Sequence, residues 1–228
     1  MIEVLRRHAR YRNSHGHDLR PVASAWSLDY LNVLLPPVVA AASVLQHVFP
    51  MAAGQVWVRL DGNGLPTSFH IRAIGHPRQG ASPAQRYASL LRQHLQPLFA
   101  VLCSLTRLAP KILWGNAARR LEPILDQALA LTGGAGPVAQ DRTHLLFSAD
   151  WPALHGGEPE PNPLFGPRRE VPQHECNGGN GCATTIRLHR QCCLYYLLPE
   201  EGYCGACPLA PQYRQPKSKP PAGAVGGV

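Results

Sequence analysis

Four of the seven cysteines of this chain lie within sixteen residues near its C-terminal end. They form an adjacent pair, Cys192 and Cys193, followed after ten residues by Cys204 and Cys207, which are separated by two residues. Thiols at such close spacing hold a metal centre or exchange disulfides. The candidates are therefore an iron–sulfur cluster, a structural zinc ion and a thiol–disulfide site.

The spacing favours an iron–sulfur cluster and leaves the other two centres open. A structural zinc site commonly takes two Cys-x2-Cys knuckles, and only Cys204 to Cys207 has that form. Adjacent cysteines suit a larger inorganic core better than one small ion, and a disulfide between them is strained and rare in a reducing compartment. The histidine-containing and plant-type [2Fe-2S] spacings are absent from the sequence.

The composition is that of a globular, basic protein. Hydrophobic residues make up 45% of the 228 positions, charged residues only 16%, and the formal net charge is +8. This charge indicates an anionic partner but does not choose among nucleic acid, a membrane surface, a small acidic ligand and an acidic redox protein. The first twenty residues carry five arginines and three histidines with few aromatic residues, a pattern more typical of a solvated helix than of a nucleic-acid-binding arm.

The N-terminal region lacks the apolar stretch and cleavage site of a secretory signal. The longest apolar run, 33–49, contains two prolines and is shorter than the roughly 20 residues that a membrane-spanning helix needs. We therefore expect a cytoplasmic protein without a transmembrane segment, although its basic surface allows peripheral association with a membrane. In that reducing compartment, clustered cysteines are metal ligands or redox groups more often than structural bridges.

Helical patterns dominate the first 155 residues. An apolar core helix is expected from Ser24, with a cap at Ser27 and a break or kink at Pro36 and Pro37. Further helices are expected from residue 83, with a divide at Pro97, and over 110–131. Between them, 56–60 and 67–72 flank the turn sequence Asp-Gly-Asn-Gly and predict a β-hairpin.

A short strand is also expected over 143–148. The fold class is therefore α+β and mainly helical: a helical body with a small β-hairpin and a short C-terminal iron–sulfur-binding segment. Composition divides the chain into a basic N-terminal segment (1–23), a helical α+β domain (24–155), a proline-rich connector (156–173), the cysteine-rich segment (174–210) and a tail expected to be disordered (211–228).

The three remaining cysteines are expected to have no metal role. Cys103 lies in an apolar helical run and is interpreted as a buried packing thiol. Cys176 and Cys182 flank a glycine-rich stretch that is too flexible to preorganise a site, so we interpret them as free loop thiols; the alternatives are a second metal or redox site and a disulfide between them. Gly115 interrupts a helical pattern at a cost in helix stability, which predicts either a tight helix crossing or a close approach of another backbone or a ligand.

The cysteine pattern, with Arg190 before it and Pro208 after it, resembles the [2Fe-2S] signature of the FhuF-type ferric siderophore reductases. The motifs over 162–165 and 113–118, and more loosely 30–42, extend the resemblance over most of residues 24–209. The resemblance implies that Cys192, Cys193, Cys204 and Cys207 are the cluster ligands. It also implies that the first body is the substrate-side domain, similar to a domain of siderophore synthetases. The sequence departs from the family at His189, where a second arginine is expected.

The resemblance implies a siderophore-iron reductase that transfers one electron to the Fe(III) of a siderophore, of the hydroxamate type, and releases Fe(II). No catalytic residue beyond the cluster is expected. The sequence has no flavin or nicotinamide fingerprint, so the expected electron donor is a ferredoxin-like protein or another reductase. The alternatives are a zinc-stabilised nucleic-acid-binding module and a non-catalytic [2Fe-2S] siderophore sensor. Groups expected to contact substrate or tune the cluster are Trp57, Trp114, Asn116, Arg187, His189 and Arg190.

Overall fold

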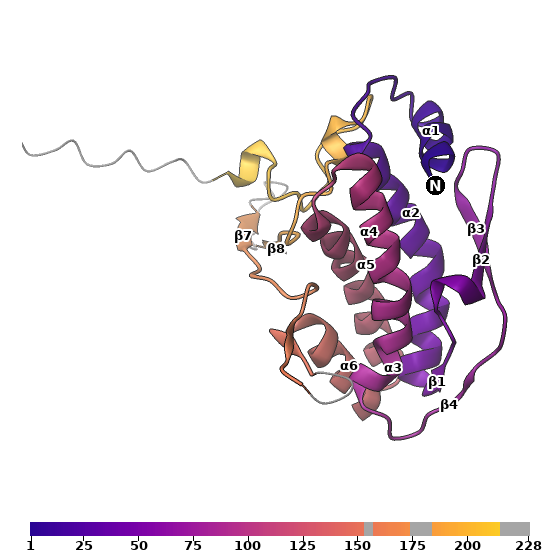
Figure 1. The fold of residues 1–228 in the computed structure, drawn as a ribbon. Coiled ribbons are helices and arrows are strands. Elements are labelled where there is room, and N and C mark those ends of the chain that lie inside the picture. The colour runs from indigo at the N-terminus through magenta and orange to yellow at the C-terminus, as the bar shows by residue number, and fades with distance from the viewer. Residues whose placement is uncertain (153–156, 174–183, 215–228) are drawn as a thin grey trace, which may run out of the picture.

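The computed structural model describes residues 1–152, 157–173 and 184–214. These residues form a helical body with small sheets and a cysteine-rich C-terminal segment (Figure 1), which confirms the α+β, mainly helical fold. The helices are α1 (Ile2–Tyr11), α2 (Arg20–Val39), α3 (Pro83–Ala88), α4 (Gln96–Thr106), α5 (Pro110–Leu131) and α6 (Gly136–Leu146).

The described strands pair two by two in antiparallel order: β1 with β4, β2 with β3, β5 with β6 and β7 with β8. Their bounds are β1 (His47–Val48), β2 (Val56–Leu60), β3 (Pro66–Ile71), β4 (His76–Pro77), β5 (Asp150–Trp151), β6 (Glu160–Pro161), β7 (Glu170–Gln173) and β8 (Thr184–Arg187).

Helix α2 is the centre of the body. It packs along α5, while α1, α4 and the β2–β3 hairpin cover other parts of it (Figure 1). With the π-helical turn that follows, it spans Arg20–Val44, which is longer than the predicted apolar run and is sufficient in length and composition to cross a membrane. Most of this segment is buried inside the body, so core packing accounts for its apolar character.

The start of α2 and its path through the prolines differ from the prediction. The helix begins at Arg20, so Ser27 is an interior, buried residue whose Oγ donates to the Ser24 carbonyl (2.7 Å) instead of capping the helix. The helix also continues through Pro36 and Pro37. Both prolines face solvent, where water can hydrate the carbonyls that they leave unpaired. The hydrogen-bonding pattern changes only afterwards, in the π-helical turn Ala40–Val44.

The predicted β-hairpin is confirmed, with β2 and β3 in antiparallel register. The Asp61 carboxylate closes its turn by accepting hydrogen bonds from the backbone N–H groups of Asn63 (2.9 Å) and Leu65 (2.8 Å). Gly64 takes a positive φ of 80° there. Its carbonyl accepts a hydrogen bond from the indole of Trp26 (2.9 Å), which fastens the hairpin to α2.

The helix after the hairpin begins as predicted. Ser82 is its N-cap, and Gln85 completes a capping box. A π-helical segment (Ser89–Leu95) then separates α3 from α4, and Pro97 lies in the first turn of α4, which agrees with the expected divide. On α4, Cys103 is half-buried and packs against the apolar core.

The strand predicted over 143–148 is wrong, because those residues belong mainly to helix α6. Val138, Leu145 and Leu146 are buried at helical spacing, and Asp141 is buried between them. The carboxylate of Asp141 pairs with Arg86 (2.6 Å) and accepts a hydrogen bond from Ser43 (2.7 Å). These long-range contacts hold α6 against α3 and the end of α2. The strand prediction failed because strand propensity depends on local sequence and contains no information about such contacts.

The connector is anchored by Asn162 and Leu164, which are both buried. The amide nitrogen of Asn162 donates to the carbonyls of Leu145 (3.1 Å) and Ser148 (2.8 Å) at the end of α6, and its amide oxygen accepts from the Leu164 N–H (2.9 Å). The neighbouring Phe165 is 45% exposed, so Leu164 is the apolar anchor of the connector. These contacts direct the chain from α6 toward β7 and the cysteine-rich segment.

Candidate iron–sulfur centre

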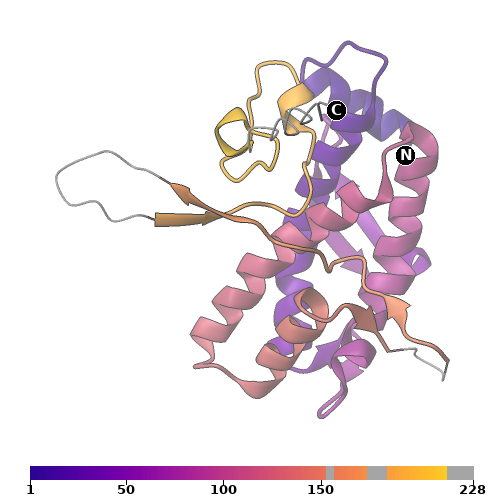
Figure 2. The ribbon, with the colours of Figure 1, turned by 90° about the vertical axis from the view of Figure 1, so that its left-hand side faces the viewer.

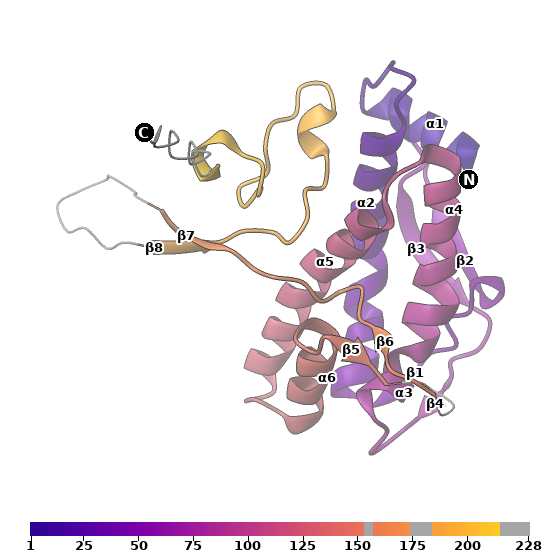
Figure 3. The same cartoon turned by 60° about the vertical axis from the view of Figure 1, so that its left-hand side comes forward.

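The cysteine-rich segment leaves β8 and folds as a set of loops beside α5 and the N-terminal half of α2 (Figure 3). Directly after the adjacent cysteines, Leu194 takes the left-handed conformation (φ 59°) and begins a short 3-10 turn, Tyr195–Leu197. This conformation is costly for a branched side chain. It turns the chain so that the Leu194 N–H donates to Cys192 Sγ (3.3 Å).

The fold brings the four predicted cluster cysteines together as two neighbouring pairs. Cys193 contacts Cys204, and Cys192 contacts Cys207. Cys192, Cys193 and Cys207 are buried, whereas Cys204 is partly exposed. All five cysteines in the described part of the chain are free thiols. The segment is therefore arranged around its sulfur atoms, with one of the four on the solvent side.

The surroundings of these thiols give them different pKa values. The hydrogen bond from Cys204, with the positive charge of Arg119, lowers the pKa of Cys193 to about 5 against the opposing effect of burial. The same bond raises the pKa of Cys204, because that thiol must keep its proton to donate. Burial raises the pKa of Cys192 to about 11. Cys193 is thus the thiol that most readily becomes a thiolate ligand.

Arg119 joins the helical body to this segment. It lies on α5 and donates from Nη2 to the backbone carbonyl of Gln191 (2.9 Å), while its Nη1 lies 4.0 Å from Cys204 Sγ. Sequence reasoning did not select this residue, because Arg119 lies more than 70 positions before the cysteines. The signal that points to it is Gly115, one turn earlier on the same helix.

Gly115 allows the cysteine-rich segment to approach α5 closely. A Cβ atom at this position would lie 2.7 Å from Cβ and 3.0 Å from Cγ of Gln191, the residue directly before Cys192. Of the two explanations offered by the sequence, the structure supports the approach of another backbone. The helix-weakening glycine therefore has a packing reason.

Three of the predicted tuning residues gather around one pocket. Arg187, His189 and Arg190 line it together with Arg119 and other residues of α5. The backbone N–H of His189 donates to the carbonyl of Ala206 (2.9 Å), between the last two cysteines. Burial, together with the nearby Arg119 and Arg120, lowers the pKa of His189 to about 4, so its imidazole is neutral at pH 7.

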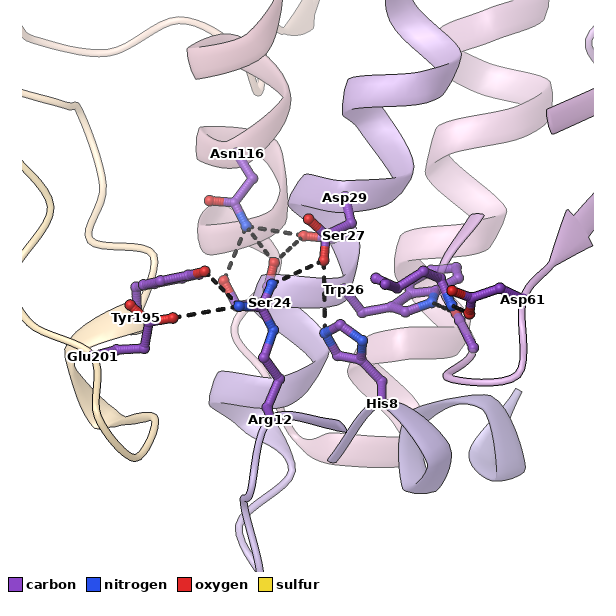
Figure 4. Close-up of polar contacts among 12 residues, drawn as sticks. His8, Arg12, Ser24, Trp26, Ser27, Asp29, Asp61, Asn116, Tyr195 and Glu201 are labelled. Atoms are coloured by element: carbon purple, nitrogen blue, oxygen red, sulfur yellow. Dashed lines mark hydrogen bonds and ion pairs between the residues drawn. The ribbon is translucent and has the colours of Figure 1, made fainter. Parts of the chain in front are cut away.

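The structure places the predicted aromatic and amide groups elsewhere. Trp114 is buried against Phe99 and Trp151. Asn116 is also buried, and its amide donates to Ser24 and Ser27 of α2, which joins α5 to α2 (Figure 4). Trp57 is exposed on the β2–β3 hairpin, across α2 from the cysteine-rich segment (Figure 1). None of these side chains lines the pocket beside the cysteines.

The basic N-terminal segment also contacts the cysteine-rich segment. Figure 4 shows Arg12 reaching Asp29 of α2 (3.2 Å), Tyr195 (2.8 Å) and Glu201 (3.4 Å). Helix α1 packs on the body through Leu5 and His8, which are fully buried. At least this part of the N-terminal positive charge is used within the protein and is not free to bind nucleic acid.

The donor set fits a two-iron cluster. In a [2Fe-2S] centre, two protein ligands bind each iron, and four thiols in two pairs match that requirement. Cys176 and Cys182 lie outside the described residues, so their interpretation as loop thiols stays a prediction.

Comparison with known families agrees with this geometry. Residues 24–177 match the model of the ferric iron reductase FhuF-like transporter family. Residues 190–209, which contain the four cysteines, match the FhuF 2Fe-2S C-terminal domain. No protein of curated function matches the chain significantly. Since the first match alone covers more than half of the sequence, the chain belongs to the FhuF-like ferric iron reductase family and carries its [2Fe-2S] domain.

Proposed function

We propose that the protein reduces the Fe(III) of a hydroxamate siderophore by one electron and so releases Fe(II). The observation that carries this proposal is the gathering of four paired thiols at the edge of the body, beside an arginine-lined pocket. A bound [2Fe-2S] cluster supplies single electrons. Hydroxamate oxygens are hard ligands that hold Fe(III) more tightly than Fe(II), so one electron loosens the chelate.

The chain contributes ligands, positive charge and a partly dry environment. Arg119 and the backbone N–H of Leu194 donate toward the sulfur atoms of Cys204 and Cys192. Hydrogen bonds and positive charge near thiolate ligands favour the more negative, reduced state. Because three of the sulfur atoms are buried and Cys204 is partly exposed, we place electron exchange with other molecules on the side of Cys204.

Electrons must come from a protein partner, and we propose a ferredoxin-like donor or another reductase in the cytoplasm. Tyr196 and Tyr203 stack on each other beside the cysteines, with ring centroids 4.7 Å apart. Tyr203, Leu197 and Leu209 each expose more than a third of their surface near this site. An apolar rim on a protein of net positive charge suits the docking of an acidic redox protein.

The first experiment is anaerobic purification followed by metal analysis and visible spectroscopy. We expect two irons per chain and a colour that bleaches on reduction. Cys193→Ser should lose the iron, whereas Cys103→Ser should keep it, because Cys103 packs in the apolar core of the body. One zinc ion per chain without visible absorption would refute the proposal and favour the zinc-stabilised module.

The second experiment tests turnover. Protein reduced with dithionite and freed of excess reductant is mixed with a ferric trihydroxamate in the presence of a ferrous trap. We expect the cluster to reoxidise as the trapped Fe(II) appears. If the chelate binds while the cluster stays reduced, the protein is a siderophore sensor and the reductase proposal is wrong.

A further inference from the structure

A pocket of about 320 Å³ lies between α5 and the chain that runs from β8 to the first cysteine. Helix α5 contributes its floor, including Gly115 and Arg119, and the opposite wall consists of residues 187–190 with Arg168 of the connector. This volume is at the lower end of the range for small-molecule sites. The pocket can therefore hold one part of an iron chelate rather than a whole siderophore.

The pocket has more positive than negative charge. Four arginines line it, namely Arg119, Arg168, Arg187 and Arg190, against two carboxylates, Glu122 and Asp126. Both carboxylates already have cationic partners. Glu122 pairs with Arg168 and with Arg187 (3.3 Å), and Asp126 pairs with Arg142 outside the pocket (2.5 Å).

Two of the arginines keep unused donors. Nε of Arg119 and Nη1 of Arg190 are buried without a hydrogen-bond partner in the part of the chain that the structure describes. Among the described residues, Arg190 donates one hydrogen bond, from Nη2 to the Leu146 carbonyl (2.7 Å). A guanidinium N–H that is buried without an acceptor is unfavourable, so an anion entering the pocket would gain from both charge neutralisation and hydrogen bonding.

Two residues that line the pocket also contact the cysteine-rich segment. Arg119 lines the pocket and at the same time approaches Cys204 Sγ (4.0 Å). His189 lines it too, while its backbone bonds to Ala206 between Cys204 and Cys207. A ligand held by Arg119 and Arg190 therefore lies beside the cysteine-rich loops, where a short distance favours electron transfer.

We propose that this arginine-lined pocket binds the iron acceptor through an anionic group, so that the preferred substrate is a ferric chelate of net negative charge, such as a citrate–hydroxamate, and not a neutral trihydroxamate. This inference rests on the proposed function, because it names the charge class of the same acceptor. Arg190 and Arg119 bind the carboxylate of the chelate, and Arg187, at the more exposed mouth of the pocket, attracts it.

The test uses binding in place of turnover. Gallium(III) has the charge of Fe(III) and a similar size but accepts no electron under these conditions. The oxidised, cluster-bearing protein is titrated calorimetrically with the gallium complex of a citrate–dihydroxamate siderophore and, separately, with that of a neutral trihydroxamate. We expect the anionic complex to bind at least about tenfold more tightly, as charge-assisted hydrogen bonds imply, and its affinity to fall with added salt.

Three variants locate the site. Arg190→Gln removes a pocket cation that has a free donor and should weaken binding of the anionic complex by about tenfold. Arg187→Gln removes a more exposed cation of the same pocket. It tests the pocket independently if Arg190→Gln disturbs the fold. Arg59→Gln is the matched control, since Arg59 is exposed on β2, outside the pocket. Iron content and the visible spectrum of each variant show whether the cluster is retained.

Equal affinity for the two gallium complexes, or equal losses in Arg190→Gln and Arg59→Gln, would overturn the inference. The ferrous-trap assay separates this failure from failure of the proposed function. If the neutral ferric trihydroxamate is reduced but no anion preference exists, only the substrate inference is wrong. If the anionic gallium complex binds through Arg190 but neither ferric chelate is reduced, the pocket assignment stands and the reductase proposal is wrong.

Discussion

Substituting Gly115 by alanine tests whether α5 positions the cysteine-rich segment. In an exposed helix interior this change stabilises by about 1 kcal/mol, because alanine has the higher helix propensity. Here the new Cβ would lie 2.7 Å from Gln191 Cβ, well inside van der Waals contact. Overpacking of this kind costs about 1–3 kcal/mol. The clash should therefore cancel the propensity gain or exceed it, and the displaced Gln191 should carry Cys192 away from its partners.

The assay is a double-mutant cycle with Gln191→Gly, which removes the side-chain atoms that the new methyl group meets. Unfolding in urea is followed by far-UV circular dichroism, and loss of iron by visible absorption. In the Gln191→Gly background, Gly115→Ala should recover its stabilisation of about 1 kcal/mol, which gives a coupling energy of about 1–3 kcal/mol. A fully stable Gly115→Ala protein that keeps its iron, with no coupling to Gln191, would refute the close approach.

Three further predictions concern charge. Arg119→Gln should lower the reduction potential of the cluster by roughly 40–60 mV in a redox titration, if the lost interaction contributes about 1–1.5 kcal/mol; an unchanged potential would mean that the guanidinium does not act on the reduced state. Asp141→Asn leaves Arg86 buried without its counter-ion and should lower the free energy of unfolding in urea by about 3–5 kcal/mol. The control Asp18→Asn removes an exposed ion pair and should lower it by under about 1 kcal/mol. Equal losses in the two variants would show that the buried pair contributes no more than the exposed one. Burial lowers the pKa of His8 to about 4 from 6.5, so the folded state binds fewer protons, and stability should fall as the pH drops from 6.5 toward 4, by on the order of 2 kcal/mol from this residue. His8→Gln should flatten part of that slope, and an unchanged slope would show that His8 does not titrate this way.

Local signals predicted the elements whose geometry is set by neighbouring residues. The Asp61-to-Gly64 turn chemistry predicted the hairpin, because the Asp61 carboxylate and a positive φ at Gly64 close the turn without distant contacts. The start of the helix at residue 83 was also predicted, since the Ser82 N-cap pairs with Gln85, only three residues away. The hydrogen bonds that close this turn and this cap join residues at most four positions apart.

Predictions failed where distant contacts decide the conformation. Residues 143–148 have strand-like composition, but the buried Arg86–Asp141 pair and the Asn162 amide hold this region as the end of α6. No break occurs at Pro36 and Pro37, because both prolines lie on the solvent side of a helix that is otherwise packed in the core. Secondary-structure propensity is weak compared with such tertiary packing.

The candidate cluster site shows the same difference between what local sequence predicts and what distant contacts decide. The sequence by itself determined the candidate ligands, since the covalent chain fixes the type and spacing of Cys192, Cys193, Cys204 and Cys207, and with them the match to the [2Fe-2S] domain. Only the tertiary structure decided what surrounds those thiols. Arg119 reaches them because α5 crosses the segment at Gly115, and three-dimensional packing, unlike ligand spacing, brings together residues that lie far apart in the chain.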